Sequence, residues 1–334
     1  MKEALFYQKK EKQKVKCLLC PHFCTIKEGE RGVCNVRKNV KGELISENYG
    51  QVTALGFDPI EKKPLYHYHP GEEILSVGSF GCNLKCDFCQ NWEISQSDID
   101  NIGRIQSHRA EEVIQIAEKK PGNLGIAYTY NEPIIYYEFM LDIAKLAKEK
   151  GLKNVMVTNG FINPDPLEKL MEVIDAFSID LKAFTDNFYK KKTSARLEPV
   201  KESLKMIKKH QKFLEITNLV IPEWNDDKKQ FSEMIRWIKN ELGEDTILHL
   251  SRYFPVYKSQ AEPTAINTLK ELYQLAKESL NYVYIGNARI AEGQDTYCSN
   301  CNKLLVKRSG YFTQLLGIDD EGKCKNCGNH VFVK

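Results

Sequence analysis

Short apolar runs alternate with amphipathic stretches through the middle of the chain. Seven runs have the length and the apolar content of buried strands: residues 73–80, 124–130, 154–160, 176–182, 213–221, 246–254 and, as a further candidate, 282–287. Between several of them, apolar residues return every three or four positions, as they do on one face of a helix. The clearest predicted helices cover residues 110–120, 201–210 and 265–280.

This alternation of strand and helix indicates a parallel sheet whose strands are joined by crossover helices. About six such units predict an α/β fold of the partial (β/α)6 TIM-like barrel type, with a doubly wound open sheet as the alternative. In both architectures ligands bind at the carboxyl ends of the strands. The segments expected there are polar and carry glycine or proline, as residues 81–91 and 129–133 do.

The charge of the chain is nearly balanced, with a net charge of +3 over 334 residues. This balance, without a stripe of Arg and Lys, disfavours nucleic acid and anionic membranes as partners. No apolar run approaches the roughly 20 residues that a membrane-spanning helix needs. The first 16 residues also lack the apolar core of a signal peptide. We therefore expect a cytoplasmic protein that does not associate with membranes.

Eleven cysteines fall into three groups, which are Cys17, Cys20, Cys24 and Cys34; Cys82, Cys86 and Cys89; and Cys298, Cys301, Cys324 and Cys327. The cytoplasm keeps thiols reduced, so clustered cysteines there more often bind metal than form disulfides. The groups predict three parts: a Cys-rich metal-binding region at 1–66, the barrel core at 67–290 and a zinc-ribbon-like module at 291–334.

The central group has the spacing C-x3-C-x2-C and follows the first predicted strand. Three thiolates on one loop bind three irons of a [4Fe–4S] cluster and leave the fourth iron open. Electron-transfer clusters use four thiolates, so an open iron indicates catalysis by Cys82, Cys86 and Cys89. Phe88 would shield one side of the cluster. The alternative is a set of structural or zinc-binding cysteines.

With this triplet the sequence resembles the radical SAM superfamily. The resemblance implies that the amino and carboxylate groups of S-adenosylmethionine (SAM) chelate the open iron. It further implies that one electron cleaves SAM, and that the resulting 5′-deoxyadenosyl radical abstracts a hydrogen atom from a substrate. A low-potential donor of the flavodoxin or ferredoxin type would supply the electron. The cofactors carry this chemistry, and the protein positions them.

Two further strand ends match superfamily motifs. Asn131 and Glu132 stand where many members have a Gly-Gly-Glu-Pro run, and by resemblance they would meet the amino group of SAM. The alternative is a polar turn that opens a helix. Residues 158–160 resemble the Asp-Thr-Asn-Gly turn of pyruvate formate-lyase activating enzymes, with Val157 in place of the Asp. Asn159 would either bind the cofactor or only cap this turn.

The Asp-Leu-Lys run that ends at Lys182 also resembles those activating enzymes. Lys182 would meet the carboxylate of SAM and Asp180 would orient it; the alternative is a mutual ion pair at the rim of the barrel. His249 and Arg252 close the sixth predicted strand and are weaker candidates for cofactor or substrate binding. His249 could equally be a core residue, whereas Arg252 could hold an anionic group such as a carboxylate.

The two outer cysteine groups each contain four thiols. Cys298-x2-Cys301 and Cys324-x2-Cys327 form two knuckles of the kind that hold zinc in a ribbon, with iron as the alternative. In a segment this short the metal would supply much of the folding energy. The N-terminal four thiols could hold zinc or a second iron–sulfur cluster, because both accept four thiolates. His22 could replace one of them.

Four motifs together, CLLCPHFC…GERGVCNVR, GCNLKCDFCQNWEIS, YTYNEP and SRYFP, resemble the radical SAM enzymes of the AmmeMemoRadiSam system. The core of that family is related to glycyl-radical-enzyme activating enzymes. The resemblance implies that companion proteins of that system, or a protein substrate, are partners. Three hypotheses remain at this stage: a radical SAM enzyme, a glycyl-radical-enzyme activase, and a non-catalytic iron–sulfur and zinc module that binds protein or RNA.

Overall fold

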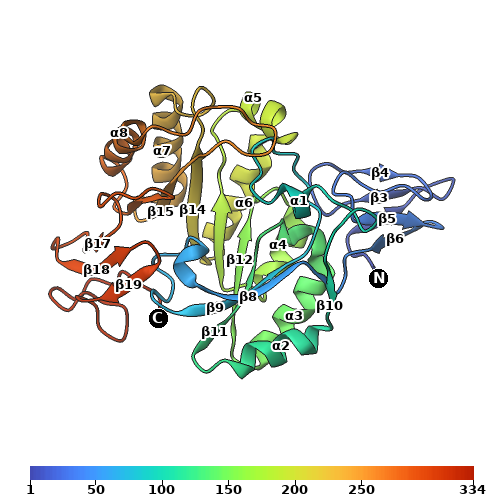
Figure 1. Cartoon of the computed structure of the whole chain (residues 1–334), viewed down its shortest axis with the longest axis horizontal. Coiled ribbons are helices and arrows are strands. Elements are labelled where there is room, and N and C mark those ends of the chain that lie inside the picture. The colour runs from blue at the N-terminus through green and yellow to red at the C-terminus, as the bar shows by residue number, and fades with distance from the viewer.

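The computed structural model describes residues 1–334, and its centre is an eight-stranded sheet with the order β16-β15-β14-β13-β12-β11-β9-β8 (Figure 1). All strands from β9 to β16 in this sheet run parallel. They are β9 (Glu73–Gly78), β11 (Asn123–Tyr128), β12 (Lys153–Thr158), β13 (Ala176–Asp180), β14 (Phe213–Val220), β15 (Ile247–Arg252) and β16 (Val283–Gly286). The predicted parallel sheet is therefore confirmed, and the run at 282–287 is its seventh parallel strand.

One edge of the sheet was not expected. β8 (Ala54–Pro59) pairs antiparallel with β9, so residues 54–59 belong to the main sheet rather than to the N-terminal region. The strand escaped prediction because its side chains are mostly half-buried and show no apolar run. β8 and β16 form opposite edges and do not pair, so the sheet is an open, partial barrel.

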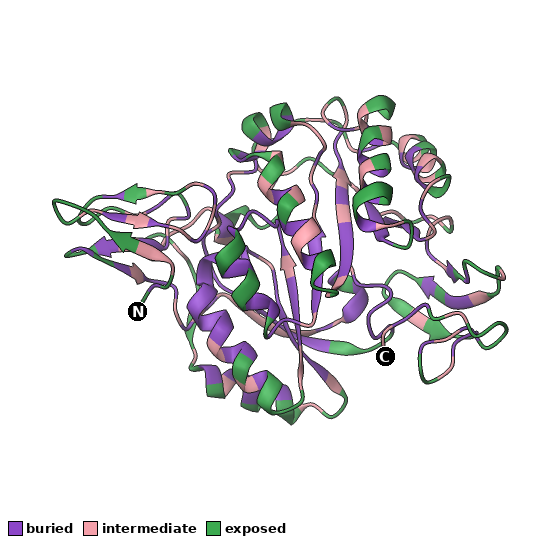
Figure 2. Ribbon diagram, turned by 180° about the vertical axis from the view of Figure 1, so that it is seen from behind, coloured by how far each residue is buried: buried purple, intermediate pink, exposed green.

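Helices cover the outer face of the sheet. The longer ones are α2 (Ala110–Lys119), α3 (Tyr137–Glu149), α4 (Pro164–Met171), α6 (Leu197–Lys209), α7 (Lys228–Leu242) and α8 (Ile266–Lys277). Figure 2 shows their buried stripes turned inward and their exposed stripes turned to solvent. In α6, for example, Val200, Leu204 and Ile207 are buried, and the lysines stand on other faces. These amphipathic helices pack on the strands and leave the inner face of the sheet for the site.

Short elements follow the carboxyl ends of the strands or connect the main parts. They are α1 (Trp92–Ser95), η2 (Pro133–Tyr136), α5 (Asp186–Phe188), η3 (Tyr189–Thr193), η1 (Ile60–Lys62), and the pair β7 (Gln51–Val52) and β10 (Gln106–Ser107). No helix of the structure has the length and apolarity that crossing a bilayer requires.

The N-terminal region projects from the body beside α1 (Figure 1). It contains two small sheets, β1 (Lys2–Glu3), β6 (Glu43–Ser46) and β5 (Arg37–Val40), and β2 (Tyr7–Lys9), β3 (Val15–Cys17) and β4 (Thr25–Ile26). A buried ion pair between Arg37 and Glu138 joins the region to α3, and both side chains are 1% exposed. Glu138 also accepts a bond from the Leu5 main chain at 2.7 Å. These bonds compensate both buried charges and fix the region against the core.

The C-terminal module lies at the opposite, amino ends of the strands. Its sheet comprises β17 (Thr296–Tyr297), β18 (Leu304–Ser309) and β19 (Phe312–Leu315). A separate apolar core joins it to Tyr66, Ile247 and Tyr282. The Arg308 guanidinium donates to the Tyr66 carbonyl at 2.8 Å. The module therefore closes the end of the sheet that is remote from the cysteine triplet.

Candidate active site

The three central cysteines lie on the loop between β9 and α1, directly after the carboxyl end of β9. Cys86 is buried, and Cys82 and Cys89 are half-buried. Main-chain bonds fix the loop, since Lys85 N donates to Thr193 O at 2.8 Å and Asp87 N donates to Lys192 O at 3.2 Å. The structure thus places all three thiols at the edge where parallel α/β sheets carry their active sites.

Gly81 allows the chain to approach the N-terminal region at this point. Its φ is +84°, and a Cβ atom there would lie 2.6 Å from the Cys34 carbonyl oxygen and from Cγ1 of Val36. Only glycine adopts this conformation without strain and leaves room for that contact. Close contact with the N-terminal region therefore requires glycine immediately before Cys82.

Asn131 holds the same loop from the side of β11. Its Oδ1 accepts a bond from Ser79 N at 2.9 Å, and its Nδ2 donates to Gly81 O at 3.0 Å. The side-chain amide therefore bonds to the chain on both sides of Phe80, just before Cys82. The structure assigns Asn131 to positioning the cysteine loop, and its contact with SAM stays a prediction.

Glu132 is a buried carboxylate without a cationic partner. Thr158 Oγ1 donates to Oε1 at 2.6 Å, Ile134 N to Oε1 at 3.1 Å, and Asn159 N to Oε2 at 2.9 Å. No Lys, Arg or His side chain forms an ion pair with it. Burial raises the pKa of Glu132 to about 7, although these hydrogen bonds lower it. An ammonium group is the partner that such a carboxylate lacks.

Asn159 connects the end of β12 to the first cysteine. Its Nδ2 donates to Asn83 Oδ1 at 2.9 Å and lies 3.9 Å from Cys82 Sγ. The Leu84 main-chain N–H donates to the same sulfur at 3.3 Å. Hydrogen bonds to a thiolate sulfur stabilise its charge and tune a bound cluster.

Lys182 and Asp180 form an ion pair at the end of β13, with 2.9 Å between Nζ and Oδ2. Burial lowers the pKa of Lys182, but the Asp180 carboxylate and the Cys86 thiolate raise it, and the net pKa lies above the ordinary value. Lys182 Nζ also lies 6.0 Å from the centre of the Phe88 ring. The pair expected as an alternative thus exists, and it places a permanent positive charge beside the thiols.

Phe88 and Arg252 occupy different environments. Phe88 is 4% exposed and packs on Phe188, with 5.9 Å between the ring centres. Arg252 is half-buried, donates from Nε to Thr264 O at 2.8 Å and stacks over Phe254. It forms no ion pair, so its terminal nitrogens are open to an anionic ligand.

His249 lies in the core, which is one of the two environments considered for it. Its Nε2 lies 2.5 Å from Glu215 Oε2, and the side chain is almost fully buried. Glu215 also accepts main-chain bonds from Tyr66 and His67 at 3.0 Å and 2.7 Å. These partners belong to the segment that closes the amino end of the sheet. His249 is therefore a buried structural residue rather than a residue aimed at the cysteine loop, as the core interpretation of a lone histidine anticipates.

The inner face of the sheet stays accessible near the strand ends. Val157, Thr217, Leu219 and Ser251 are half-buried. The residues that alternate with them in β12 and β14 are buried, as is Leu250 in β15, whereas Arg252 at the end of β15 is half-buried. Thr217 Oγ1 and Ser178 Oγ are buried atoms without a hydrogen-bond partner. This face therefore offers both access and unsatisfied polar groups to a ligand.

Sequence reasoning did not select Asn83, and it included Thr158 only as part of the turn motif at residues 158–160. Asn83 binds Phe161 O and Asn159, and Thr158 binds Glu132. Both stand next to a residue that was selected, but only their contacts across the strand ends reveal their part in the site.

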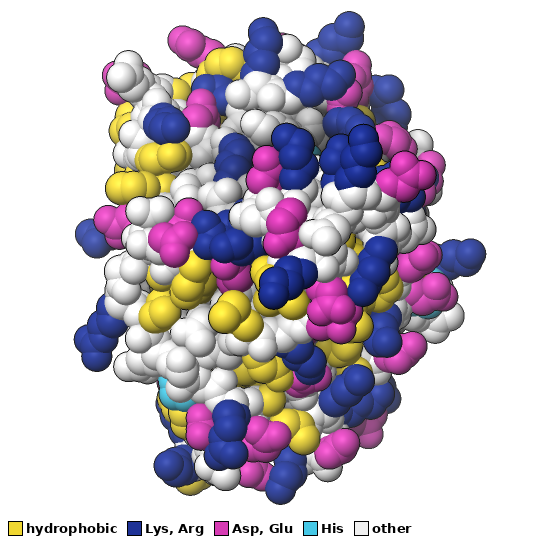
Figure 3. Space-filling model, turned by 90° about the vertical axis from the view of Figure 1, so that its right-hand side faces the viewer, with side chains coloured by type: hydrophobic (Ala, Val, Ile, Leu, Met, Phe, Trp, Pro, Cys, Tyr) yellow, Lys and Arg dark blue, Asp and Glu magenta, His cyan; other side chains and the backbone are white.

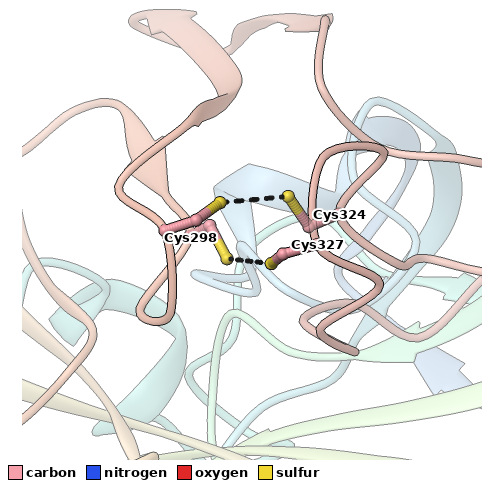
Figure 4. Close-up of side chains that lie close together, drawn as sticks. Cys298, Cys324 and Cys327 are labelled. Atoms are coloured by element: carbon pink, nitrogen blue, oxygen red, sulfur yellow. Dashed lines mark hydrogen bonds between the residues drawn. The ribbon is translucent and has the colours of Figure 1, made fainter.

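The C-terminal thiols meet at one point (Figure 4). The four sulfurs of Cys298, Cys301, Cys324 and Cys327 lie within 4.8 Å of one another. Cys298 and Cys327, and Cys301 and Cys324, are 3.6 Å apart. Tetrahedral zinc with Zn–S bonds of about 2.3 Å places its sulfurs about 3.8 Å apart. The quartet therefore has the geometry of a site for a single ion.

The N-terminal thiols come together more loosely. Cys17 N donates to Cys24 O at 2.9 Å, and Phe23 N donates to Cys20 O at 3.2 Å. Burial raises the pKa of Cys20 above its usual range, and the other three thiolates of the group raise it further. No three of these sulfurs lie within 4.8 Å of one another. His22 bonds through Nε2 to Asn83 O at 2.7 Å, so its ring is engaged by the cysteine loop.

Comparison with known proteins agrees with this arrangement. A family model for the radical SAM superfamily matches residues 76–238. An uncharacterized protein of Methanocaldococcus jannaschii is 45% identical over 336 residues, which cover 100% of this chain and 99% of that protein. The pyruvate formate-lyase-activating enzyme of Clostridium pasteurianum is 27% identical over 176 residues, or 51% of this chain and 71% of the enzyme.

Among solved structures, a radical SAM methyltransferase from Sphaerobacter thermophilus superposes with a TM-score of 0.53 at 14% identity, over 71% of each chain. Fold and site thus define an α/β protein that presents a cysteine triplet at the carboxyl ends of a parallel sheet. Residues 76–238 form a radical SAM superfamily domain, and the chain is homologous to pyruvate formate-lyase activating enzymes. Its narrower placement in the AmmeMemoRadiSam system stays a prediction.

Proposed function

We propose that this protein cleaves SAM reductively with a [4Fe–4S] cluster on Cys82, Cys86 and Cys89 and abstracts a hydrogen atom from a substrate. The observation that carries the proposal is the presence of three thiols on one loop beside an uncompensated buried carboxylate and a half-buried lysine. When bound, the cluster supplies one electron to the sulfonium of SAM. The donor set fits the cluster, because three thiolates leave one iron free for SAM.

Residues around the loop have separate roles in this proposal. Glu132 accepts the ammonium of SAM, which would supply the cation that the carboxylate lacks. Lys182 attracts the carboxylate of SAM while Asp180 holds its Nζ in place. Asn131 positions the loop, and Asn159 donates toward the Cys82 sulfur. Charge-assisted hydrogen bonds of this kind are stronger than neutral ones and orient the ligand.

The inner face would receive the nucleoside and the substrate. Val157 and Leu219 offer apolar contact, and the unsatisfied hydroxyls of Ser178 and Thr217 can bond to hydroxyl or base groups. Arg252, which lies at the carboxyl end of β15 and alternates with the inner-face residue Ser251, has no ion pair and would bind an anionic group of the substrate. A reduced protein of the flavodoxin or ferredoxin type is the expected electron donor.

A glycyl-radical-enzyme activase is the second candidate, because several relatives carry that description. One is the enzyme from Clostridium pasteurianum, and another is a putative glycyl-radical enzyme activating enzyme of M. jannaschii, 26% identical over 230 residues. In that case the substrate is a protein backbone. Figure 3, which shows the face with the N-terminal region, has cationic and anionic side chains interspersed, so this face carries no single-sign track for RNA.

The C-terminal quartet is proposed to hold zinc. The distances between its sulfurs match a single tetrahedral ion, and a closed four-thiolate site is structural. Such an ion would hold the module over the amino ends of the strands.

The test is anaerobic reconstitution with iron and sulfide, reduction with dithionite and measurement of 5′-deoxyadenosine formed from SAM. We expect product from the native chain and none from Cys82→Ala, Cys86→Ala or Cys89→Ala. Cys301→Ala controls for loss of a thiol far from the site and should still give product if the variant is folded. A reconstituted native protein with an intact cluster and no 5′-deoxyadenosine would sink the proposal.

A further inference from the structure

The two outer cysteine quartets differ in the spacing of their sulfurs. All four C-terminal sulfurs lie within 4.8 Å of one another, whereas no three N-terminal ones do. A single zinc ion needs its thiolates about 3.8 Å apart, because each binds the same atom at about 2.3 Å. In a [4Fe–4S] cluster each thiolate binds a different iron at a different corner, so the sulfurs stand farther apart. The N-terminal set lacks the close spacing of a single-ion site, and a cluster does not require that spacing.

The main chain nevertheless brings these four cysteines into one place. β3 and β4 pair through Val15 and Ile26, which sets Cys17 opposite Cys24. On the other side, a Cβ atom on Gly32 would lie 3.6 Å from Cys24 Sγ, and Gly32 is two residues from Cys34. The wide spacing of the sulfurs is therefore a feature of a folded, hydrogen-bonded site rather than of a loose loop.

A buried cation adjoins this quartet. Arg37 is 1% exposed, and its Nε has no hydrogen-bond partner. Arg37 stands three residues after Cys34, and its main-chain carbonyl accepts a hydrogen bond from Gly32 N at 2.9 Å, which ties it to the same loop. A cluster held by four thiolates is anionic, so an arginine with an unsatisfied N–H is a suitable neighbour.

The quartet also lies directly behind the catalytic loop. The Cys34 carbonyl packs on Gly81, and His22 Nε2 lies 2.7 Å from Asn83 O. Asn163, just after the end of β12, donates to Leu18 O at 2.7 Å. The segment that carries Cys17 and Cys20 is thereby hydrogen-bonded to the surroundings of the catalytic triplet.

We propose that Cys17, Cys20, Cys24 and Cys34 hold a second iron–sulfur cluster, closed by four thiolates and packed against the loop of Cys82. Four thiolates leave no open iron, which is the arrangement of electron-transfer clusters. This inference deepens the proposed function, because it rests on the first cluster being the catalytic one.

Metal content of the native chain, purified without oxygen, tests the inference directly. We expect about eight irons, a matching amount of acid-labile sulfide and about one zinc per chain. About four irons and two zincs would overturn it, because zinc would then occupy both outer quartets. This measurement needs no variant and so does not depend on the folding of one.

The triple variant Cys82→Ala/Cys86→Ala/Cys89→Ala separates the two proposals. If the inference holds, it retains about four irons and, after reduction, an electron paramagnetic resonance signal of a cluster. A triple variant without iron overturns the second cluster and leaves the catalytic one intact. If the variant instead keeps all of the iron of the native chain, the catalytic assignment fails and the N-terminal site stands. The matched variant Cys17→Ala/Cys20→Ala should lose the other half of the iron.

Discussion

Glu132 Oε2 accepts the main-chain N–H of Asn159 at 2.9 Å, and this bond joins the end of β11 to the end of β12. The same Asn159 directs its side chain toward Asn83 and the Cys82 sulfur. Two polar contacts, both made by Asn159, therefore link the buried carboxylate to the first thiol of the catalytic triplet. A change of charge at Glu132 acts on the place where cofactor and cluster would meet.

Glu132→Gln should weaken SAM binding and leave the iron content unchanged. The substitution keeps the shape and removes the negative charge that would face the ammonium. We expect the Kd for SAM to rise at least about tenfold, which corresponds to about 1.4 kcal/mol. Calorimetric titration of the reconstituted protein measures it. Glu172→Gln is the control, because Glu172 is exposed and directly follows α4. If both variants bind SAM with the same Kd, Glu132 does not contact SAM.

Glu132 should also make folding stability depend on pH. Its pKa is raised by burial from 4.5 to about 7, so the native state binds more protons than the unfolded state between these values. Stability is then highest below about pH 4.5 and falls as the pH rises toward 7, by about 3 kcal/mol from this group alone. Urea unfolding of the native chain and of Glu132→Gln at pH 5 and pH 7 isolates the contribution. An identical pH dependence in both proteins contradicts the prediction.

Lys182→Met should lower both stability and SAM affinity. The variant leaves Asp180 without its partner at 2.9 Å and removes the positive charge beside Cys86. We expect a loss of about 1 kcal/mol in unfolding free energy and a weaker binding of SAM. Lys190→Met breaks an exposed ion pair with Asp186 and should change stability by less than about 0.5 kcal/mol. Denaturant unfolding measures the unfolding free energy of both variants, and titration measures their Kd for SAM.

Gly81→Ala should disturb the cysteine loop. The added Cβ would lie 2.6 Å from the Cys34 carbonyl oxygen, at a φ of +84° that disfavours alanine. We expect a loss of roughly 2 kcal/mol or more and a reduced iron content after reconstitution. Gly103→Ala is the matched control, because a Cβ there meets nothing within 4 Å. Unaltered iron loading in Gly81→Ala would show that the loop tolerates displacement.

Removal of metal from the C-terminal module should destabilise the protein. Its core, with Leu305, Val306 and Phe332, packs on Tyr66 and Ile247 at the amino ends of the strands. Strong chelators should release about one zinc per chain and lower Tm by more than about 5 °C. Calorimetry before and after chelation measures the shift. Added zinc should restore Tm and added magnesium should not; a Tm that chelation leaves unchanged counts against a structural ion.

Local pattern was enough to predict the main sheet. Strands buried on both faces show as continuous apolar runs, and the runs at 73–80 and 213–221 became β9 and β14 with ends shifted by at most two residues. The pattern could not predict β8, since an edge strand with half-buried side chains depends on the partner it finds. For the same reason, the N-terminal region predicted at residues 1–66 includes β8, a strand that belongs to the main sheet.

For the site, the sequence by itself determined the chemistry that is available: three thiols at C-x3-C-x2-C spacing after a strand, a carboxylate at 132 and a lysine at 182. Tertiary structure alone decided how these groups are used. In the folded chain Asn131 bonds to the cysteine loop and His249 pairs with Glu215. The sulfurs of the C-terminal quartet lie close together, whereas those of the N-terminal quartet form no such close group. Identity and spacing of residues are local properties, whereas burial, hydrogen-bond partners and distances between sulfurs depend on segments that meet only when the chain has folded.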